Sequence, residues 1–383
     1  MYVTRSLAAA ALLAIAAGCG SSTSQPGGSA SAGVGGSVGV GGSGSGGAET
    51  VAKLPAGWNE IKPGGESICS RGGEFAFWAR PGKVNRLIVD FIGGGACWNQ
   101  LTCSIAGQLF SPDVQNVRDA VAKNEPHGLY DHDRADNPFA DWHHVIIPYC
   151  TGDIHWGNAV KDYGDNTIIN HKGAVNTKAV LDWIYQNYSG PEAVLVTGCS
   201  AGSYGSAMWA AHVAKHYEKA HVMQFGDSGA GIITQDFFKA SFPNWNAKPI
   251  FPTWISALDP SKVDVEKLTL VDLYAFLVAF YPQHQFSQYN TAFDKTQTFY
   301  FTAMGGKKED WSPMMLQSIA DIDKRAPAFG SFVPSGEQHC ILLTDNFYTV
   351  NAGGVRLIDW LKDMAAKKPL VDAKCAKCDT PTP

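Results

Sequence analysis

The stretch AVLVTGCSAG, residues 193–202, decides the fold of this chain. It opens with a short run rich in Val and Thr, residues 193–197, which is typical of a buried strand. The sequence Gly198-Cys199-Ser200-Ala201-Gly202 follows, and residues 201–217 then carry apolar side chains at helical spacing. This segment therefore predicts a strand, a tight turn at Ser200 and a helix, in that order.

The turn contains the pattern Gly-x-Ser-x-Gly. Between a strand and a helix, this pattern is the nucleophile elbow of α/β-hydrolases, whose glycines permit a sharp turn that exposes the serine oxygen. Residues 35–39 have the same pattern but lie in a stretch of Gly and Ser, with no strand or helix beside them. We therefore predict Ser200 as a nucleophile, and the alternative is a serine that only forms a turn.

The rest of the chain alternates strand-like and helix-like segments. Helices are expected at residues 167–188 and 354–366. Such alternation predicts an α/β-hydrolase fold, a mostly parallel sheet flanked by helices. Residues 232–296 are rich in aromatic side chains and Pro, and we interpret them as a lid-like insertion over the site. Besides residues 193–197, the predicted strands are residues 87–92, 145–148, 222–225, 298–303 and 330–333.

Composition excludes several classes of protein. Of the 383 residues, 45% are hydrophobic and 17% are charged, so a fully disordered chain and a fibre are excluded. The net charge of −5, without a strongly basic segment, does not fit a nucleic-acid-binding protein. The length allows two domains or one large one, and we expect a neutral or small partner.

The N-terminus predicts export. Arg5 precedes the apolar residues 7–17, a stretch too short to span a bilayer, so residues 1–18 are predicted to be a signal peptide. The sequence before Cys19 resembles a bacterial lipobox, which makes Cys19 a candidate for lipidation; ordinary cleavage is the alternative. Residues 19–50 form a Gly/Ser-rich linker, and residues 51–383 form the hydrolase domain. We expect a cell-surface or outer-membrane lipoprotein, or otherwise a secreted protein.

An acyl-transfer serine needs donors for the oxyanion. In α/β-hydrolases these are the N–H after the nucleophile, here Ala201, and an N–H from a loop after an early strand. Gly93-Gly94-Gly95 follows the predicted strand at residues 87–92. We therefore predict Gly94, Gly95 and Ala201 as the oxyanion hole.

The remaining triad members should follow Ser200 in the order acid and then His. His339 lies just after the predicted strand at residues 330–333, and we predict it as the base. The loop after the predicted strand at residues 298–303 offers Asp310, which we choose as the acid. The alternatives are Glu309, Asp321 and Asp323.

Cysteine usage also indicates an oxidising compartment. Eight cysteines besides Cys19 allow four disulfides, and spacing alone leaves 105 pairings open. The Cys-x-x-Cys at the C-terminus raises zinc as an alternative, but no second ligand pair is evident, so no metal is predicted. The disulfide candidates are Cys69, Cys97, Cys103, Cys150, Cys199, Cys340, Cys375 and Cys378.

Four motifs together resemble the pectin acetylesterase family, which is related to the Notum carboxylesterases. The resemblance implies an α/β-hydrolase fold, removal of acyl groups, and a Ser-Asp-His triad that carries over onto Ser200 and His339. The acid of that family follows its strand in a Tyr-Asp-x-x-Gln-like setting, whereas residues 305–308 separate Asp310 from the predicted strand. The motifs are GGGACWN with TC at residues 93–103, IPYCTGD at 147–153, GCSAGS at 198–203 and QHC at 338–340.

The same resemblance implies two disulfides, Cys97 with Cys103 and Cys69 with Cys150. Cys199 is then left to pair with Cys340, and Cys375 with Cys378. A Cys199–Cys340 bond would join the nucleophile loop to the histidine loop.

We predict a serine carboxylesterase, without a cofactor, that removes O-acetyl or other short acyl groups through an acyl-enzyme. The expected partner is an acylated polysaccharide such as pectin, or a small ester. We expect a monomer that contacts a membrane only through a lipid on Cys19. The alternative is a non-enzymatic surface lipoprotein that binds carbohydrate or lipid on a hydrolase scaffold. Gly226-Asp227-Ser228-Gly229 with His144 also suggests a chymotrypsin-like protease, which the βα alternation disfavours.

Overall fold

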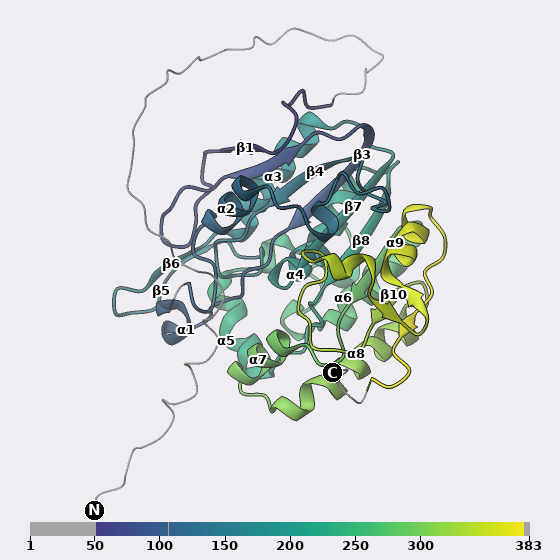
Figure 1. The fold of residues 1–383 in the computed structure, drawn as a ribbon. Helices are drawn as coiled ribbons and strands as arrows, with labels where there is room; N and C mark the ends of the chain where they lie inside the picture. Colours follow the sequence, from purple (N-terminus) through teal and green to yellow (C-terminus); the bar gives the residue numbers. More distant parts are fainter. Residues whose placement is uncertain (1–50, 106, 379–383) are drawn as a thin grey trace, which may run out of the picture. The chain divides into compact units, whose positions relative to one another are not determined.

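The central sheet has nine strands in the order β1-β2-β4-β3-β7-β8-β9-β10-β13. Figure 1 labels β1, β3, β4, β7, β8 and β10 among them. All neighbouring pairs from β4 to β13 are parallel, whereas β2 runs antiparallel to both β1 and β4. The strands are β1 (Asn59–Ile61), β2 (Phe77–Arg80), β3 (Val84–Phe91), β4 (Trp142–Ile147), β7 (Ala193–Cys199), β8 (His221–Asp227), β9 (Gln285–Tyr289), β10 (Gly330–Val333) and β13 (Ala373–Lys374). This mostly parallel sheet is the predicted α/β-hydrolase architecture.

This computed structural model describes residues 51–105 and 107–378, which belong to one compact unit. The predicted signal peptide (1–18), the lipidation candidate Cys19 and the linker (19–50) lie outside the described residues. Within the described part of the chain, no helix has the length and apolar character that crossing a membrane requires.

Helices cover both faces of the sheet because its central strands are apolar on both sides. Along β7, Val194 and Val196 face one core cluster while Ala193 and Leu195 face the other. The first cluster includes side chains of α3, α4, α6 and α8, and the second includes α9. The helices are α1 (Gln100–Ser104), α2 (Gln115–Lys123), α3 (Gly173–Asn187), α4 (Ala201–His216), α5 (Gln235–Trp245), α6 (Leu270–Phe280), α7 (Lys295–Ala303), α8 (Trp311–Arg325) and α9 (Leu357–Ala365).

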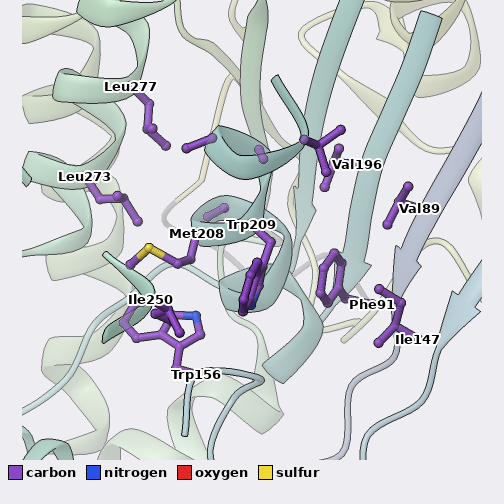
Figure 2. Close-up of a cluster of buried hydrophobic side chains, with 14 of the residues drawn as sticks. Val89, Phe91, Ile147, Trp156, Val196, Met208, Trp209, Ile250, Leu273 and Leu277 are labelled. Carbon is purple, nitrogen blue, oxygen red and sulfur yellow. The ribbon is translucent and has the colours of Figure 1, made fainter. Parts of the chain in front are cut away.

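Helix α4 packs closely on the sheet. A Cβ on Gly202 would clash with the carbonyl oxygen of Phe91 on β3, so only glycine permits this approach. Figure 2 shows Met208 and Trp209 of α4 between side chains of α6 and those of the strands. This packing fixes the helix that begins directly after Ser200.

Three sequence predictions about elements need correction. Residues 298–303 belong to helix α7 and do not form a strand. Their Phe, Tyr and Thr side chains favour strands, but Asp294 caps a helix that begins at Lys295 and continues through them. The missing strand is β9, which lies inside the predicted insertion at 232–296. That segment is therefore partly core, since β9 belongs to the central sheet and α6 contributes side chains to the first core cluster. The helix expected at 167–188 begins at Gly173, since residues 168–171 form β6.

Two small two-stranded sheets and four disulfides complete the structure. Strand β5 (Ala159–Asp162) pairs with β6 (Ile168–His171), and β11 (Asn351–Ala352) pairs with β12 (Val355–Arg356). The disulfides are Cys69–Cys150, Cys97–Cys103, Cys199–Cys340 and Cys375–Cys378.

Candidate active site

Ser200 lies on a strained turn between β7 and α4. Its backbone has φ 56° and ψ −120°, a conformation that non-glycine residues rarely adopt. The N–H of Ser200 donates to the carbonyl of Asp227 at 2.8 Å, which ties the turn to the end of β8. A Cβ on Gly93 would come within 2.5 Å of the carbonyl oxygen of Cys199, so the glycine loop also packs against this turn. These contacts have the geometry of a nucleophile elbow.

His339 lies in the connection after β10 and contacts a buried carboxylate. Its Nδ1 donates to Oδ2 of Asp294 at 2.8 Å, and the Asp294 side chain is fully buried. The other ring nitrogen, Nε2, is buried and has no hydrogen-bond partner among the described residues. His339 and Ser200 line the same cavity. An imidazole held in this tautomer has its free Nε2 available to accept a proton.

The carboxylate of Asp294 is itself held in place. Its Oδ1 accepts from the N–H groups of Thr296 and Gln297, both at 2.9 Å, and so caps helix α7. Its Oδ2 accepts from Nε2 of Gln297 at 3.0 Å as well as from His339. Gln297 in turn accepts from the N–H of Ala230 at 2.8 Å. These contacts fix the orientation of the carboxylate.

The structure therefore places Asp294, and not Asp310, beside His339. Asp310 is exposed at the end of a short 3₁₀ turn before α8, and Glu309 and Asp321 are exposed too. Asp323 pairs with Lys374 at 2.7 Å. The choice of Asp310 depended on a strand at 298–303, but that segment is a helix, and the carboxylate beside His339 follows β9 instead.

A signal for Asp294 was present in the sequence. Phe293-Asp294-Lys295-Thr296-Gln297 fits the Tyr-Asp-x-x-Gln-like setting of the family acid, with Phe in place of Tyr. It follows β9, which lies within residues 232–296, the segment interpreted as an insertion. The Gln of this pattern is the residue that holds the Asp294 carboxylate.

Gly95 and Ala201 line the cavity beside Ser200. Ala201 is the first residue of α4, so its N–H has no acceptor within the helix. Gly95 has φ +74°, and a Cβ there would clash with Leu109 and Tyr300, which explains why glycine is required. Gly94 is not among the residues that line the cavity, and its carbonyl accepts from the N–H of Ser111 at 2.9 Å.

The cavity at Ser200 has a volume of about 720 Å³ and a mostly apolar wall to which several aromatic side chains contribute. Phe237, Phe238, Phe242 and Trp245 come from α5 in the predicted insertion, and they lie in the wall together with Trp98 and Trp156. Of the other aromatic residues in that segment, Tyr274 and Tyr281 are buried in the protein core, and the partly buried Trp254 packs against it. Charged side chains, among them Glu266 and Arg325, also line the cavity.

The Gly226–Gly229 motif has a structural position that excludes the protease alternative. It ends β8 of a parallel sheet, and Ser228 donates to the Asp227 carboxylate at 2.9 Å while accepting from the N–H of Cys340 at 3.0 Å. His144 lies on β4 and contacts Asp90 and His132. Burial raises the pKa of Asp227 to about 7.

The fold and this site define a carboxylic ester hydrolase of the α/β-hydrolase class. A family model described as Pectinacetylesterase matches residues 62–303, more than half of the chain. This chain belongs to the pectinacetylesterase family.

Among solved structures, the Wnt deacylase Notum from Drosophila is similar in fold. The TM-score is 0.59 at 16% sequence identity, over 81% of this chain and 93% of that chain. No relative is found among curated protein sequences.

Proposed function

We propose that this protein is a serine carboxylesterase in which Ser200, His339 and Asp294 form the catalytic triad. The observation that carries the proposal is the hydrogen bond between Nδ1 of His339 and buried Asp294, which leaves Nε2 free at the cavity that Ser200 lines. Ser200 stands on the strained turn that this chemistry uses to expose its nucleophile.

The geometry supports the following reaction. Oγ of Ser200 attacks the ester carbonyl while Nε2 of His339 takes the hydroxyl proton. The N–H groups of Ala201 and Gly95 stabilise the resulting oxyanion. The alcohol leaves with the proton from His339, and an acyl group remains on Ser200. Water then attacks that acyl-enzyme in the same way and releases the carboxylic acid. Asp294 orients the imidazole and stabilises its protonated form.

We propose an O-acylated polysaccharide such as pectin as the substrate, with acetyl as the acyl group. The cavity favours a second candidate, an ester with a longer acyl chain. About 720 Å³ of mostly apolar space far exceeds an acetyl group, and burial of each CH₂ contributes about 0.8 kcal/mol. Notum, which is similar in fold, is a Wnt deacylase, so removal of an acyl group is a chemistry that this fold hosts.

The test is hydrolysis of p-nitrophenyl esters from acetate to octanoate, with acetate release from acetylated pectin measured in parallel. Ser200→Ala should lose activity by a factor of about 10³ or more. A preference for acetate together with release from pectin supports the polysaccharide substrate, whereas a preference for octanoate supports the longer acyl group. If wild type and Ser200→Ala are equally inactive on every ester, the non-enzymatic binding function replaces this proposal.

We also propose export, followed by lipidation at Cys19. Four disulfides among the described residues fit an oxidising compartment. The intact mass of the mature chain tests this: a chain that begins at Cys19 with bound lipid supports it, and an unprocessed chain contradicts it.

A further inference from the structure

His339 lies in a segment without a regular secondary structure of its own. Residues 334–344, which we call the histidine loop, connect β10 to a short 3₁₀ turn that begins at Asp345. The position of the imidazole therefore depends on contacts that the loop makes with other parts of the chain. Thr291 donates to the carbonyl of Gln338 at 2.8 Å, and the N–H of Phe293 donates to Gly336 at 2.9 Å. These bonds join the loop to the segment that carries Asp294.

A second set of contacts joins the histidine loop to the nucleophile side. The Cys199–Cys340 disulfide links the residue before Ser200 to the residue after His339, across 141 positions of sequence. A ring nitrogen of His339 and the two sulfur atoms lie within 4.8 Å of one another. The disulfide is therefore packed beside the imidazole as well as bonded to its neighbour.

Hydrogen bonds of Asp227 and Ser228 also join the histidine loop to the turn at Ser200. The carbonyl of Asp227 accepts from the N–H of Ser200, and its Oδ2 accepts from the N–H of Leu342 at 3.0 Å. The hydroxyl of Ser228 accepts from the N–H of Cys340 at 3.0 Å. Asp227 also pairs with Cys199 in the register of β7 and β8. One buried residue thus contacts both sides of the site.

Three of the residues joined by these contacts have a strained backbone. Ser200, Ser228 and Cys340 all have positive φ, at 56°, 57° and 61°. Non-glycine residues persist in this region only when the surroundings hold them, and such residues cluster at functional sites.

We infer that a set of contacts, which we call the histidine-loop anchor, positions the imidazole of His339 relative to Ser200 for proton transfer. The anchor consists of Cys199, Cys340, Asp227 and Ser228. The inference rests on the proposed function. Its four members are positioning residues, because they act through His339 and Ser200. Loss of the anchor should lower kcat and leave KM unchanged, since a displaced base slows proton transfer while the apolar cavity wall formed by Phe237, Phe238 and Phe242 is unaltered.

The test compares two disulfide-removal variants in the full chain. Cys199→Ala/Cys340→Ala removes the anchor disulfide, and Cys375→Ala/Cys378→Ala is the matched control at the C-terminal end. Hydrolysis of p-nitrophenyl acetate is measured below the unfolding temperature of each variant. We expect kcat of Cys199→Ala/Cys340→Ala to fall about 10²-fold while KM stays constant. The rate at which a fluorophosphonate labels Ser200 should fall in parallel. The control should have the kcat and KM of wild type.

A second variant keeps the test informative if the first does not fold. Ser228→Ala retains the disulfide but removes the acceptor of the Cys340 N–H, and we expect kcat to fall about 10-fold. If every folded anchor variant has wild-type kcat and wild-type labelling rates, with a change only in melting temperature, the inference is wrong. If wild type neither hydrolyses the ester nor reacts with the fluorophosphonate, the proposed function itself fails.

Discussion

Asp294 caps helix α7 with one carboxylate oxygen and holds Nδ1 of His339 with the other. The start of the helix and the orientation of the imidazole are thus set by a single buried side chain. The bond to Nδ1 keeps the imidazole in the tautomer whose Nε2 is free to accept a proton.

Asp294→Asn separates these two roles. The amide oxygen still accepts from the helix N–H groups, so α7 stays capped, but the amide nitrogen faces the Nε2 donor of Gln297 and the melting temperature should fall. The amide nitrogen would also face Nδ1 of His339 and favour the wrong tautomer, so kcat should fall by about 10³-fold or more. Asp310→Asn is the control and should retain wild-type kcat on p-nitrophenyl acetate. Equal losses in both variants would contradict the assignment.

Gln297 should affect kcat because it holds the Asp294 carboxylate in place. Gln297→Met keeps the length of the side chain but removes the donor to Oδ2 and the acceptor for Ala230. We expect about a 10-fold loss in kcat, because partners of this kind orient the groups that they support. Gln115→Met, an exposed change on α2, serves as the control. Steady-state kinetics with the acetate ester give the comparison, and wild-type kcat in Gln297→Met would count against this role.

The cavity wall should control acyl-chain length. Leu270 lies at the start of α6 and lines the cavity, so Leu270→Trp reduces the space for the chain. We expect kcat/KM for p-nitrophenyl octanoate to fall about 10-fold while the value for acetate is unchanged. Phe280→Trp, at an exposed position of the same helix, is the control. If both esters respond equally, the chain occupies another part of the cavity.

Buried histidines should make the protein less stable in acid. Burial lowers the pKa of His171 to about 4, so the unfolded chain binds a proton there between about pH 6.5 and 4 when the folded chain does not. The contribution of His171 to the free energy of unfolding is therefore fully present above pH 6.5 and is lost as the pH falls toward 4. By pH 4.5 the loss should be about 2 kcal/mol.

His171→Asn tests that effect. Asn provides a donor for the carbonyl of Thr151, which His171 Nδ1 contacts at 2.9 Å, but it does not titrate. Urea unfolding at pH 7 and pH 4.5 should show a smaller difference for the variant than for wild type. Identical differences would show that His171 does not contribute to the acid sensitivity.

Local patterns sufficed for part of the fold and for the position of two candidate site residues. The run of small and β-branched residues before Ser200 and the helix after it are consecutive in sequence, so they identified β7, α4 and the turn between them. His339 follows a short apolar strand, β10, and was predicted for the same reason; both residues line one cavity.

Asp294 was not predicted as the partner of His339 because the strand before it lacks an apolar pattern. Strand β9 reads Gln-Phe-Ser-Gln-Tyr, and its buried Ser287 and Gln288 make tertiary hydrogen bonds that no local pattern reveals, such as Ser287 Oγ to the carbonyl of Gln224 at 2.7 Å. Residues 298–303 have strand propensity yet continue the helix that Asp294 caps. Tertiary context therefore decided both elements, and with them which carboxylate lies beside His339.

The most direct test of the triad is the mass of the protein after rapid acid quenching of its reaction with a p-nitrophenyl ester. We expect an added mass equal to the acyl group, located by peptide mapping on the fragment that contains Ser200 and absent from Ser200→Ala. An acyl group on another residue, or ester hydrolysis that persists in Ser200→Ala, would contradict the account.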